Sequence, residues 1–479
     1  MTPDGRPDRP TVAVVGGGVA GLAAAFLLKD AGVAVTVLEG SPRLGGKLSV
    51  SEVGGVAVDA GAEALLARRP EGVGLITELG LAGELQSPGT TAAGIWTRGR
   101  IRSLPRRQFM GVPADFDELA ATGIVSGDGL ARARQDLSLA DSAPDGDESV
   151  TSRVGGRFGT EVVDRLVEPL LGGVYAGRCE DLSFEATLPA LAQAARGRRS
   201  LTQAAASLLP PSPASAEAAP SAPPVFTTLT GGLGALPAAL AKASGADVQT
   251  SAMVRELART ATGWRLTVGS AHEPRLFDAD AVIIAVPGRP GSRLLAAVAG
   301  AAAGPLGEVR YASMAIVTLA YPEGAFEPPV TGSGFLVPAI ERRAIKAVTF
   351  STVKWPHLRQ RGAGLHIVRC SVGRLGEEAV LQRDDGELAA LAAADLHDAT
   401  GVAGEPVDVR VTRWGGGLPQ YSVGHLDRVA RIRAGIAAQP GLAVCGAAYD
   451  GVGIPACIST AKLAVDQVLA YLGSQDMSV

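Results

Sequence analysis

The stretch that decides the fold is TVAVVGGGVAGLAAAFLLKDAGVAVTVLEGSPRLGGK, residues 11–47. A β-branched run, Thr11–Val15, enters a glycine turn. An Ala- and Leu-rich helix follows to about Asp30, and a second strand runs over Val33–Leu38. The spacing is G-x-G-x-x-G, with a strand before it, a helix after it and an acid about 20 residues further on. This context predicts a dinucleotide-binding βαβ unit.

Each position of this motif has its own physical role. Gly16 permits the tight turn, Gly18 lets a diphosphate approach the backbone, and Gly21 lets the helix pack close to the strand. The helix N-terminus offers free N–H groups and positive dipole to the phosphates. Glu39 can accept hydrogen bonds from both ribose hydroxyls and would repel a 2′-phosphate. The predicted contacts of the turn are Gly16, Gly17, Gly18, Val19, Ala20 and Gly21.

A second glycine-rich run, GSPRLGGK (40–47), follows Glu39 directly. Its R-x-G-G pattern resembles the extended FAD fingerprint of the amine-oxidase-like flavoproteins, in which the backbone and a basic side chain reach the diphosphate from the other side. An ordinary surface loop is the alternative interpretation. We therefore expect FAD as cofactor, with further contacts from Gly40, Arg43, Gly46 and Lys47.

Composition excludes several classes of function. The 479 residues are 47% hydrophobic and 19% charged, enough for two or three domains with a large core. The 44 basic and 48 acidic residues give a net charge of −4, which signals neither nucleic acid nor an anionic membrane surface. The four cysteines and five histidines lack metal-ligand spacing, so we expect free core thiols and no metal.

The sequence also predicts a soluble protein. The N-terminus, MTPDGRPDRP, is polar and lacks the apolar region of a signal peptide. No run reaches the roughly 18 apolar residues that a membrane span needs. We expect a cytoplasmic location, at most peripheral to a membrane.

Periodicity organises the rest of the chain. Alternation predicts hairpins over 48–59 and 93–104, and helical spacing of Leu, Ala and Val predicts helices over 115–195. The segment 196–224, which contains LLPPSPASAEAAPSAPP, predicts a surface loop without fixed structure. The uninterrupted run Ala279–Pro287 predicts a buried strand that returns to the nucleotide-binding sheet.

Runs between 310 and 372 predict a second, mixed or antiparallel sheet. The expected fold is therefore α/β: a Rossmann-like FAD-binding domain, an inserted α+β substrate domain and a helical subdomain. The predicted boundaries are 1–66, 225–300 and 408–479 for the FAD-binding domain, 67–105 and 301–407 for the substrate-binding domain, 106–195 for the helical subdomain and 196–224 for the flexible loop.

Five further stretches resemble a single family. They are ESV (148–150) with Gly155–Gly159 and Glu161, EPLLGGVYAG (168–177), KWPH (354–357), PQYSVGH (419–425) and YDGVGIP (449–455) with Cys457 and Ile458. In this order, over nearly the whole chain, they resemble the FAD-dependent porphyrinogen oxidases of haem biosynthesis. The similarity is greatest to the soluble bacterial members, which oxidise coproporphyrinogen III to coproporphyrin III. Relatives that act on protoporphyrinogen IX are more often membrane-bound.

The resemblance implies more FAD contacts. The segment Gly61, Ala62, Glu63 and Ala64 is expected to run under the flavin. Relatives often carry Gly-Pro there, so Gly-Ala predicts a softer turn. Val254 matches a residue whose backbone meets the adenine side, and Trp414 matches a flavin-proximal aromatic. The C-terminal turn, followed by a helix, contributes Val452, Gly453 and Ile454.

The implied reaction removes six electrons and six protons from the macrocycle in three rounds. In each round a meso C–H gives a hydride to flavin N5 and a pyrrole N–H loses a proton. Oxygen then reoxidises the flavin and yields hydrogen peroxide. No triad, carboxylate pair or metal set is recognisable, which fits a reaction whose chemistry the cofactor carries. The resemblance also suggests a transient contact with a ferrochelatase.

Coproporphyrinogen carries four propionates, which favour arginine at the rim of the cavity because arginine binds carboxylates bidentately. The candidates are Arg68, Arg69, Arg98, Arg100, Arg102, Arg106 and Arg107, each with a solvated surface charge as the alternative. Lys354 and Trp355 either line the substrate lobe or lie at the end of a strand. Tyr175 is either a cavity aromatic or part of the helical core.

Three alternative functions remain. A protoporphyrinogen IX oxidase would share every motif. An amine oxidase or carotenoid desaturase would share the N-terminal fingerprint but not the 172–177 and 354–357 stretches, and six tyrosines and four tryptophans leave little for an amine oxidase's aromatic cage. A non-catalytic flavin- or porphyrin-binding protein is the third.

Overall fold

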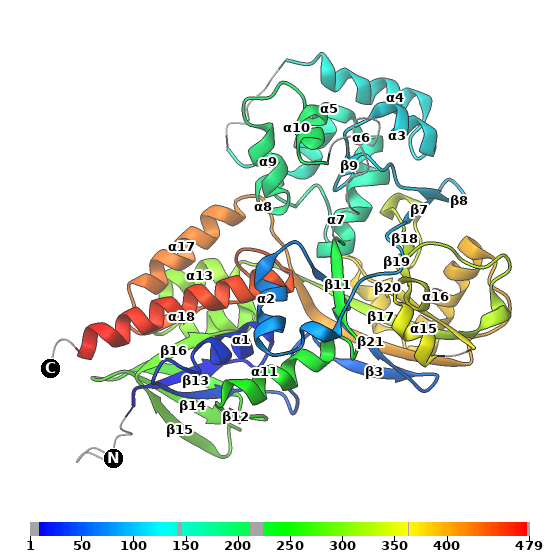
Figure 1. The fold of residues 1–479 in the computed structure, drawn as a ribbon. Helices are drawn as coiled ribbons and strands as arrows, with labels where there is room; N and C mark the ends of the chain where they lie inside the picture. The colour runs from blue at the N-terminus through cyan, green and yellow to red at the C-terminus, as the bar shows by residue number, and fades with distance from the viewer. Residues whose placement is uncertain (1–8, 141–145, 211–223, 363, 477–479) are drawn as a thin grey trace.

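The computed structural model describes residues 9–140, 146–210, 224–362 and 364–476. Figure 1 shows three parts: a sheet with long helices at the lower left, a second sheet at the right, and a group of helices above both. The α/β architecture expected from the sequence is present. In the described parts, no helix combines the length and apolar character needed to cross a bilayer.

The first part contains a five-stranded sheet in which every neighbouring pair is parallel. The strand order is β12 (Asp247–Gln249), β2 (Ala34–Leu38), β1 (Thr11–Val15), β16 (Ala281–Ile284) and β22 (Leu442–Val444). In the register, Val14 of the central strand β1 lies opposite Val37 and Ile283. Three segments far apart in the sequence therefore build one sheet, as the β-branched runs predict.

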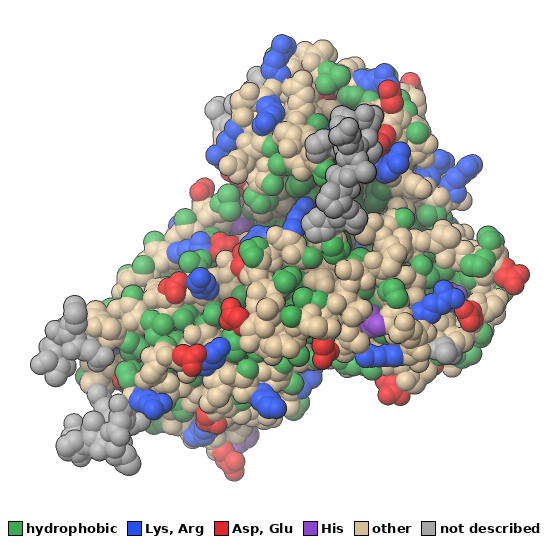
Figure 2. Space-filling view, viewed as in Figure 1, with side chains coloured by type: hydrophobic (Ala, Val, Ile, Leu, Met, Phe, Trp, Pro, Cys, Tyr) green, Lys and Arg blue, Asp and Glu red, His purple; other side chains and the backbone are tan. Residues whose placement is uncertain are grey.

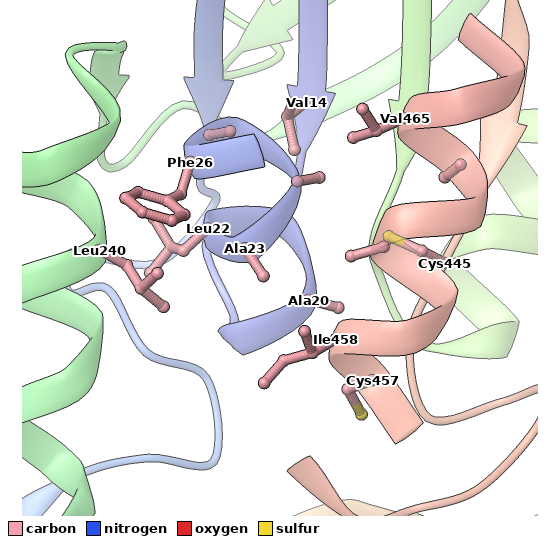
Figure 3. Packing of buried hydrophobic residues seen from close by; sticks show 14 of the residues in the cluster. Val14, Ala20, Leu22, Ala23, Phe26, Leu240, Cys445, Cys457, Ile458 and Val465 are labelled. Atoms are coloured by element: carbon pink, nitrogen blue, oxygen red, sulfur yellow. The ribbon is translucent and has the colours of Figure 1, made fainter. Parts of the chain in front are cut away.

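Alternate residues of these strands enter two different cores. On one face, Val12 and Val14 pack against α1 (Val19–Leu27), α11 (Leu236–Ser244) and α18 (Ile454–Asp476). Figure 3 shows this packing, with Ala20 of α1 and Ile458 of α18 between the helices. Small side chains on α1 allow the close approach. The other face is covered by β13 (Val254–Arg259), β14 (Trp264–Gly269), β15 (Pro274–Ala279), α12 (Gly288–Leu295), α13 (Gly300–Gly307) and α17 (His425–Ala437).

The second part is a seven-stranded mixed sheet. Its order is β21 (Asp408–Pro419), β17 (Tyr311–Pro322), β20 (Leu365–Val372), β19 (Ile345–Phe350), β18 (Gly334–Leu336), β7 (Gly94–Thr97) and β8 (Arg100–Ser103). Only β18 and β7 pair in parallel within it. Helix α16 (Asp385–Thr400) packs on one face. The predicted 93–104 hairpin is confirmed, with positive φ at Arg98 and Gly99 in its turn.

The third part is helical, as predicted, and includes α3 (Phe116–Thr122), α4 (Gly127–Arg134), α7 (Glu168–Tyr175) and α9 (Pro189–Ala195). The prediction that 196–224 lacks fixed structure is wrong over α10 (Leu201–Ser207). The Ser200 hydroxyl caps this helix at the Gln203 N–H, and Leu201 is buried in the helical core. Residues 211–223 of the same prediction lie outside the described residues.

The distribution of surface charges and the state of the cysteines agree with what the composition predicts. On the face shown in Figure 2, basic and acidic side chains are interspersed over the lower part of the molecule. The four cysteines are buried and free, as expected for core thiols: Cys179, Cys370, Cys445 and Cys457.

Candidate functional site

The glycine turn after β1 contains two glycines that the packing requires, Gly16 and Gly21, and a third, Gly18, that faces open space. A Cβ on Gly16 would lie 2.7 Å from the Ala285 carbonyl oxygen, and one on Gly21 would lie 1.9 Å from the Gly16 carbonyl oxygen. A Cβ on Gly18 would meet nothing within 4 Å. Gly18 is also the N-cap of α1 and offers no side-chain cap to its first N–H groups. A cradle with free donors, which a side chain would fill, fits a diphosphate.

Glu39 lies beside this cradle at the end of β2. Its Oε2 accepts a hydrogen bond from Gly17 N at 2.6 Å, and its Oε1 accepts one from Ser41 N at 2.8 Å. The carboxylate therefore ties the first glycine turn to the start of the second glycine run. Each oxygen keeps a lone pair with which it can accept a hydroxyl hydrogen.

The two glycine runs lie side by side. Gly45 N donates to Gly17 O at 2.8 Å, and Gly18 and Gly45 form an isolated parallel bridge. Arg43 donates from Nη2 to Gly46 O at 2.8 Å, which closes the second run on itself. Its guanidinium lies 5.8 Å from the centre of the Trp414 ring. The structure thus brings together both fingerprints and the predicted flavin-side aromatic.

Lys47 places its side-chain nitrogen near the first turn of α18, where Cys457 lies. Burial lowers the pKa of Lys47, and Cys457 in the first turn of α18 has the smaller, opposite effect. Among the described residues its ammonium has no hydrogen-bond or ion-pair partner. A half-buried amine that has no counter-ion in the described part of the chain, near the first turn of a helix, is a suitable environment for a phosphate.

The predicted flavin segment begins against Lys47. A Cβ on Gly61 would lie 1.9 Å from the Lys47 carbonyl oxygen, so this position requires glycine. Ala62 N donates to the same oxygen at 3.3 Å, a bond that a proline at this position would lack. Trp414 Nε1 donates to Ala60 O at 3.0 Å. The segment is therefore fixed to both the second glycine run and β21.

Glu63 anchors this segment through a buried ionic network. Its Oε1 accepts from Lys354 Nζ at 2.7 Å, and its Oε2 accepts from Arg369 Nη1. Arg369 Nη2 also donates to Gly61 O at 2.6 Å. Burial alone would raise the pKa of Glu63, but Lys354 and Arg369 lower it to about 2. Glu63 is thus a permanent carboxylate at neutral pH, and Lys354 serves it as counter-ion.

Asp59 holds a different turn in place. Its Oδ2 accepts from Leu233 N at 3.0 Å and its Oδ1 accepts from Gly234 N at 2.9 Å. Burial raises the pKa of Asp59 to about 6 in spite of these two hydrogen bonds. Neither this role nor that of Arg369 was predicted. Asp59 ends a predicted hairpin, but its partners are more than 170 positions away, and Arg369 is an ordinary strand residue in the sequence.

The C-terminal glycine turn is clamped by Tyr421. The Tyr421 hydroxyl donates to Ala447 O at 2.8 Å and accepts from Gly451 N at 2.7 Å, so it bridges both ends of the turn. The ring stacks on His425 with centroids 3.8 Å apart. Beyond Gly451, Val452 is half-buried, Gly453 is exposed and Ile454 begins α18, the helix that packs on α1.

We expect Tyr421→Phe to loosen this turn. The substitution keeps the ring and its stacking but leaves Ala447 O and Gly451 N without their partner, at a cost of about 1–3 kcal/mol. Flavin release during thermal unfolding, followed by flavin fluorescence, should begin at a lower temperature than in the wild type. Tyr471→Phe, near the C-terminal end of α18, is the control. Equal release temperatures for the two variants would contradict the clamp.

Val254 and Gly40 lie close together on the far side of the fingerprint. Ala252 N donates to Glu39 O at 2.8 Å, and a Cβ on Gly40 would lie 2.6 Å from the Met253 methyl carbon. Val254 follows as the buried first residue of β13. The predicted adenine-side residue therefore neighbours the predicted ribose acid.

The predicted substrate residues do not converge on one rim. Arg98 pairs with Glu161 of the helical part, and Arg69 pairs with Glu71 at 2.8 Å. Tyr175 is 6% exposed and packs in the helical core, the second of the two interpretations above. Arg68 is exposed and has no ion pair among the described residues. Of the candidate cations, Lys354 alone is bonded to the predicted flavin segment.

Comparison with known proteins decides the family. Residues 19–469 match the family described as flavin containing amine oxidoreductase. The chain belongs to this family. A flavin-containing amine oxidoreductase is a flavoprotein, and the open cradle at Gly18, the Lys47 cation and the Glu39 carboxylate fit such a cofactor.

Three proteins that are similar to this chain are named as porphyrinogen oxidases. The coproporphyrinogen III oxidase of Mycobacterium tuberculosis (strain ATCC 25618 / H37Rv) is 39% identical over 96% of this chain and 98% of its own. That of Bacillus subtilis (strain 168) is 32% identical over 97% and 98%. A solved structure of a candidate protoporphyrinogen oxidase from Exiguobacterium sp. 255-15 has a TM-score of 0.85 at 29% identity, and covers 97% of this chain and 100% of its own.

Proposed function

We propose that this protein is an FAD-dependent coproporphyrinogen III oxidase of haem biosynthesis that uses oxygen as acceptor and releases hydrogen peroxide. The observation that carries the proposal is the 39% identity, along 96% of the chain, to an enzyme of that name. The resemblance of 168–177, 354–357 and 419–425 supports the same substrate. We place the enzyme in the cytoplasm, where its product would pass to a ferrochelatase.

FAD, rather than FMN, is the flavin that suits the site. A second phosphate and an adenosine ribose would use the open cradle at Gly18, the Lys47 ammonium and the free lone pairs of Glu39. When bound, the flavin would accept hydride from the substrate. The residues that would hold it are Gly16, Gly17, Gly18, Val19, Ala20, Gly21, Glu39, Gly40, Arg43, Gly46, Lys47, Gly61, Ala62, Glu63, Ala64, Val254, Trp414, Val452, Gly453 and Ile454.

The protein's own groups would mainly bind and orient. Arg369 and Lys354 hold Glu63, and through it the segment under the flavin, so neither is free for a propionate. Arg98 is likewise engaged by Glu161. From the predicted set, Arg68 and Arg100 have no ion pair among the described residues, so either guanidinium could bind a propionate bidentately.

We expect the purified protein to be yellow, to release FAD on denaturation and to oxidise coproporphyrinogen III in air. Porphyrin fluorescence should rise faster with this four-carboxylate substrate than with protoporphyrinogen IX, and three molecules of hydrogen peroxide should accompany each macrocycle. Parallel samples without protein measure autoxidation. A faster reaction with protoporphyrinogen IX would favour that enzyme instead, and no reaction above autoxidation with either substrate would refute the proposal.

A further inference from the structure

A small polar cavity lies behind the predicted flavin segment. Its volume is about 20 Å³, and its walls come from β4 (Val56–Asp59), α14 (Ser351–Lys354), α15 (Pro356–Arg361) and β20. A single internal water needs about 10–15 Å³, so the cavity has room for one such molecule. Both carboxylates described above, Asp59 and Glu63, line it, together with Arg369.

Five buried polar atoms of the residues that line this cavity have no hydrogen-bond partner within the described ranges. They are Thr228 Oγ1, Ser351 Oγ, Trp355 Nε1, His357 Nδ1 and Arg369 Nε. Each residue is at most 9% exposed. Buried polar groups are nearly always satisfied by protein or by ordered water. Their convergence on one cavity indicates a polar occupant.

The hydrogen-bonding capacities of these five atoms indicate which kind of molecule occupies the cavity. Trp355 Nε1 and Arg369 Nε can only donate, whereas the two hydroxyls can donate or accept and His357 Nδ1 does either according to its tautomer. A metal cation would face two donor groups, and the Asp59 and Glu63 carboxylates that could attract it already accept hydrogen bonds from Leu233 N, Gly234 N, Lys354 and Arg369. An anion would face the Asp59 and Glu63 carboxylates. Water accepts two hydrogen bonds and donates two, which matches this mixed set.

We propose that the cavity binds one internal water molecule that positions the flavin-facing segment. The water accepts hydrogen bonds from Trp355 Nε1 and Arg369 Nε. The two Nη atoms of Arg369 already donate to Glu63 and Gly61, so the water fixes the remaining Nε side of the guanidinium. Arg369 in turn holds Gly61 O and Glu63. Trp355 is thus a positioning residue that acts on the segment 61–64 through the water and Arg369. The link to the cofactor rests on the proposed function; the water itself does not.

Trp355→Phe tests the water, with Trp264→Phe as a matched control. Both indoles are at most 1% exposed, both have an unpartnered Nε1, and each has a cation near its ring, Lys354 at 4.9 Å and Arg259 at 4.8 Å. Trp264 packs in the β13–β15 core away from the cavity. If Trp355 binds water, its loss should lower the thermal midpoint by about 2 °C or more. Both substitutions leave a small cavity, which lowers the midpoint in either variant, but the N–H of Trp264 has no partner among the described residues, so the midpoint of Trp264→Phe should fall by less than that of Trp355→Phe.

Three further readouts complete the test. A crystal structure of the holoenzyme should show water within hydrogen-bond distance of Trp355 Nε1 and Arg369 Nε, and Ser351→Ala, which removes one hydroxyl, should lower the midpoint in the same direction as Trp355→Phe. The absorbance spectrum of bound flavin should change in Trp355→Phe and not in Trp264→Phe. An empty cavity, or equal midpoints for the two tryptophan variants, would overturn the water site. An unchanged spectrum would overturn the positioning role, and neither result depends on porphyrinogen turnover.

Discussion

Gly18→Val is expected to yield folded protein without flavin. Gly18 has φ −77° and ψ 179°, a conformation that valine adopts readily, and its Cβ would meet no protein atom within 4 Å. The new side chain would instead occupy the cradle in which we place the diphosphate. We expect flavin content, measured as the ratio of flavin to protein absorbance, to fall about tenfold or more, which corresponds to about 1.4 kcal/mol or more of binding free energy.

Gly74→Val provides the control for this variant. Gly74 lies in α2 (Pro70–Glu78) and its Cβ also has no neighbour within 4 Å, so the same side chain is added at a site away from the cradle. Far-ultraviolet circular dichroism of both variants should match the wild type, and Gly74→Val should retain flavin. A fully loaded, yellow Gly18→Val protein would show that the diphosphate lies elsewhere.

Glu63→Gln is expected to be the most destabilising single charge removal at the site. The substitution leaves Lys354 and Arg369, whose side chains are 17% and 7% exposed, without their shared counter-ion. Removing one partner of a buried ionic network costs about 3–5 kcal/mol, because the remaining charges stay out of water. The free energy of unfolding in denaturant should fall by this amount, and flavin should be lost at lower denaturant concentration.

Glu71→Gln is the matched control, because it removes the carboxylate of the Arg69 pair on the surface. Those side chains are 45% and 28% exposed, so the expected loss is about 0–1 kcal/mol. If the two variants lose similar stability, Glu63 does not anchor the buried network.

The stabilisation by Glu63 should depend on pH with a definite sign. Its pKa in the folded protein, about 2, lies below the ordinary value of 4.5. A lowered carboxyl pKa contributes stability that is fully present above pH 4.5 and is lost as the pH falls through about 2. The difference in unfolding free energy between the wild type and Glu63→Gln should therefore shrink as the pH is lowered below 4.5. A difference that grows on acidification would contradict the ion pairs.

The fingerprint strands and helices could be predicted because their signals are local. The β-branched run Thr11–Val15, the glycine turn and the α1 helix follow from patterns within about 20 residues. Helix α10 could not be predicted. It lies beside a Pro- and Ser-rich run, and its Ala-rich sequence does not show which residues will be capped and buried. There the Ser200 hydroxyl and the burial of Leu201 decided the outcome.

The sequence by itself determined the family, the βαβ unit around the first glycine turn and the second glycine run, because each depends on residue types at short, fixed spacing. Only the tertiary structure decided what these residues do to one another. Arg369 and Glu63 are 306 positions apart, and Tyr421 lies 30 positions before the Gly451 N–H that it binds. Such partners are set by strand register and helix packing, which act over the whole chain, so no local pattern contains them. The same reason explains why Lys354, a candidate for the substrate in the sequence, is the counter-ion of Glu63 in the fold.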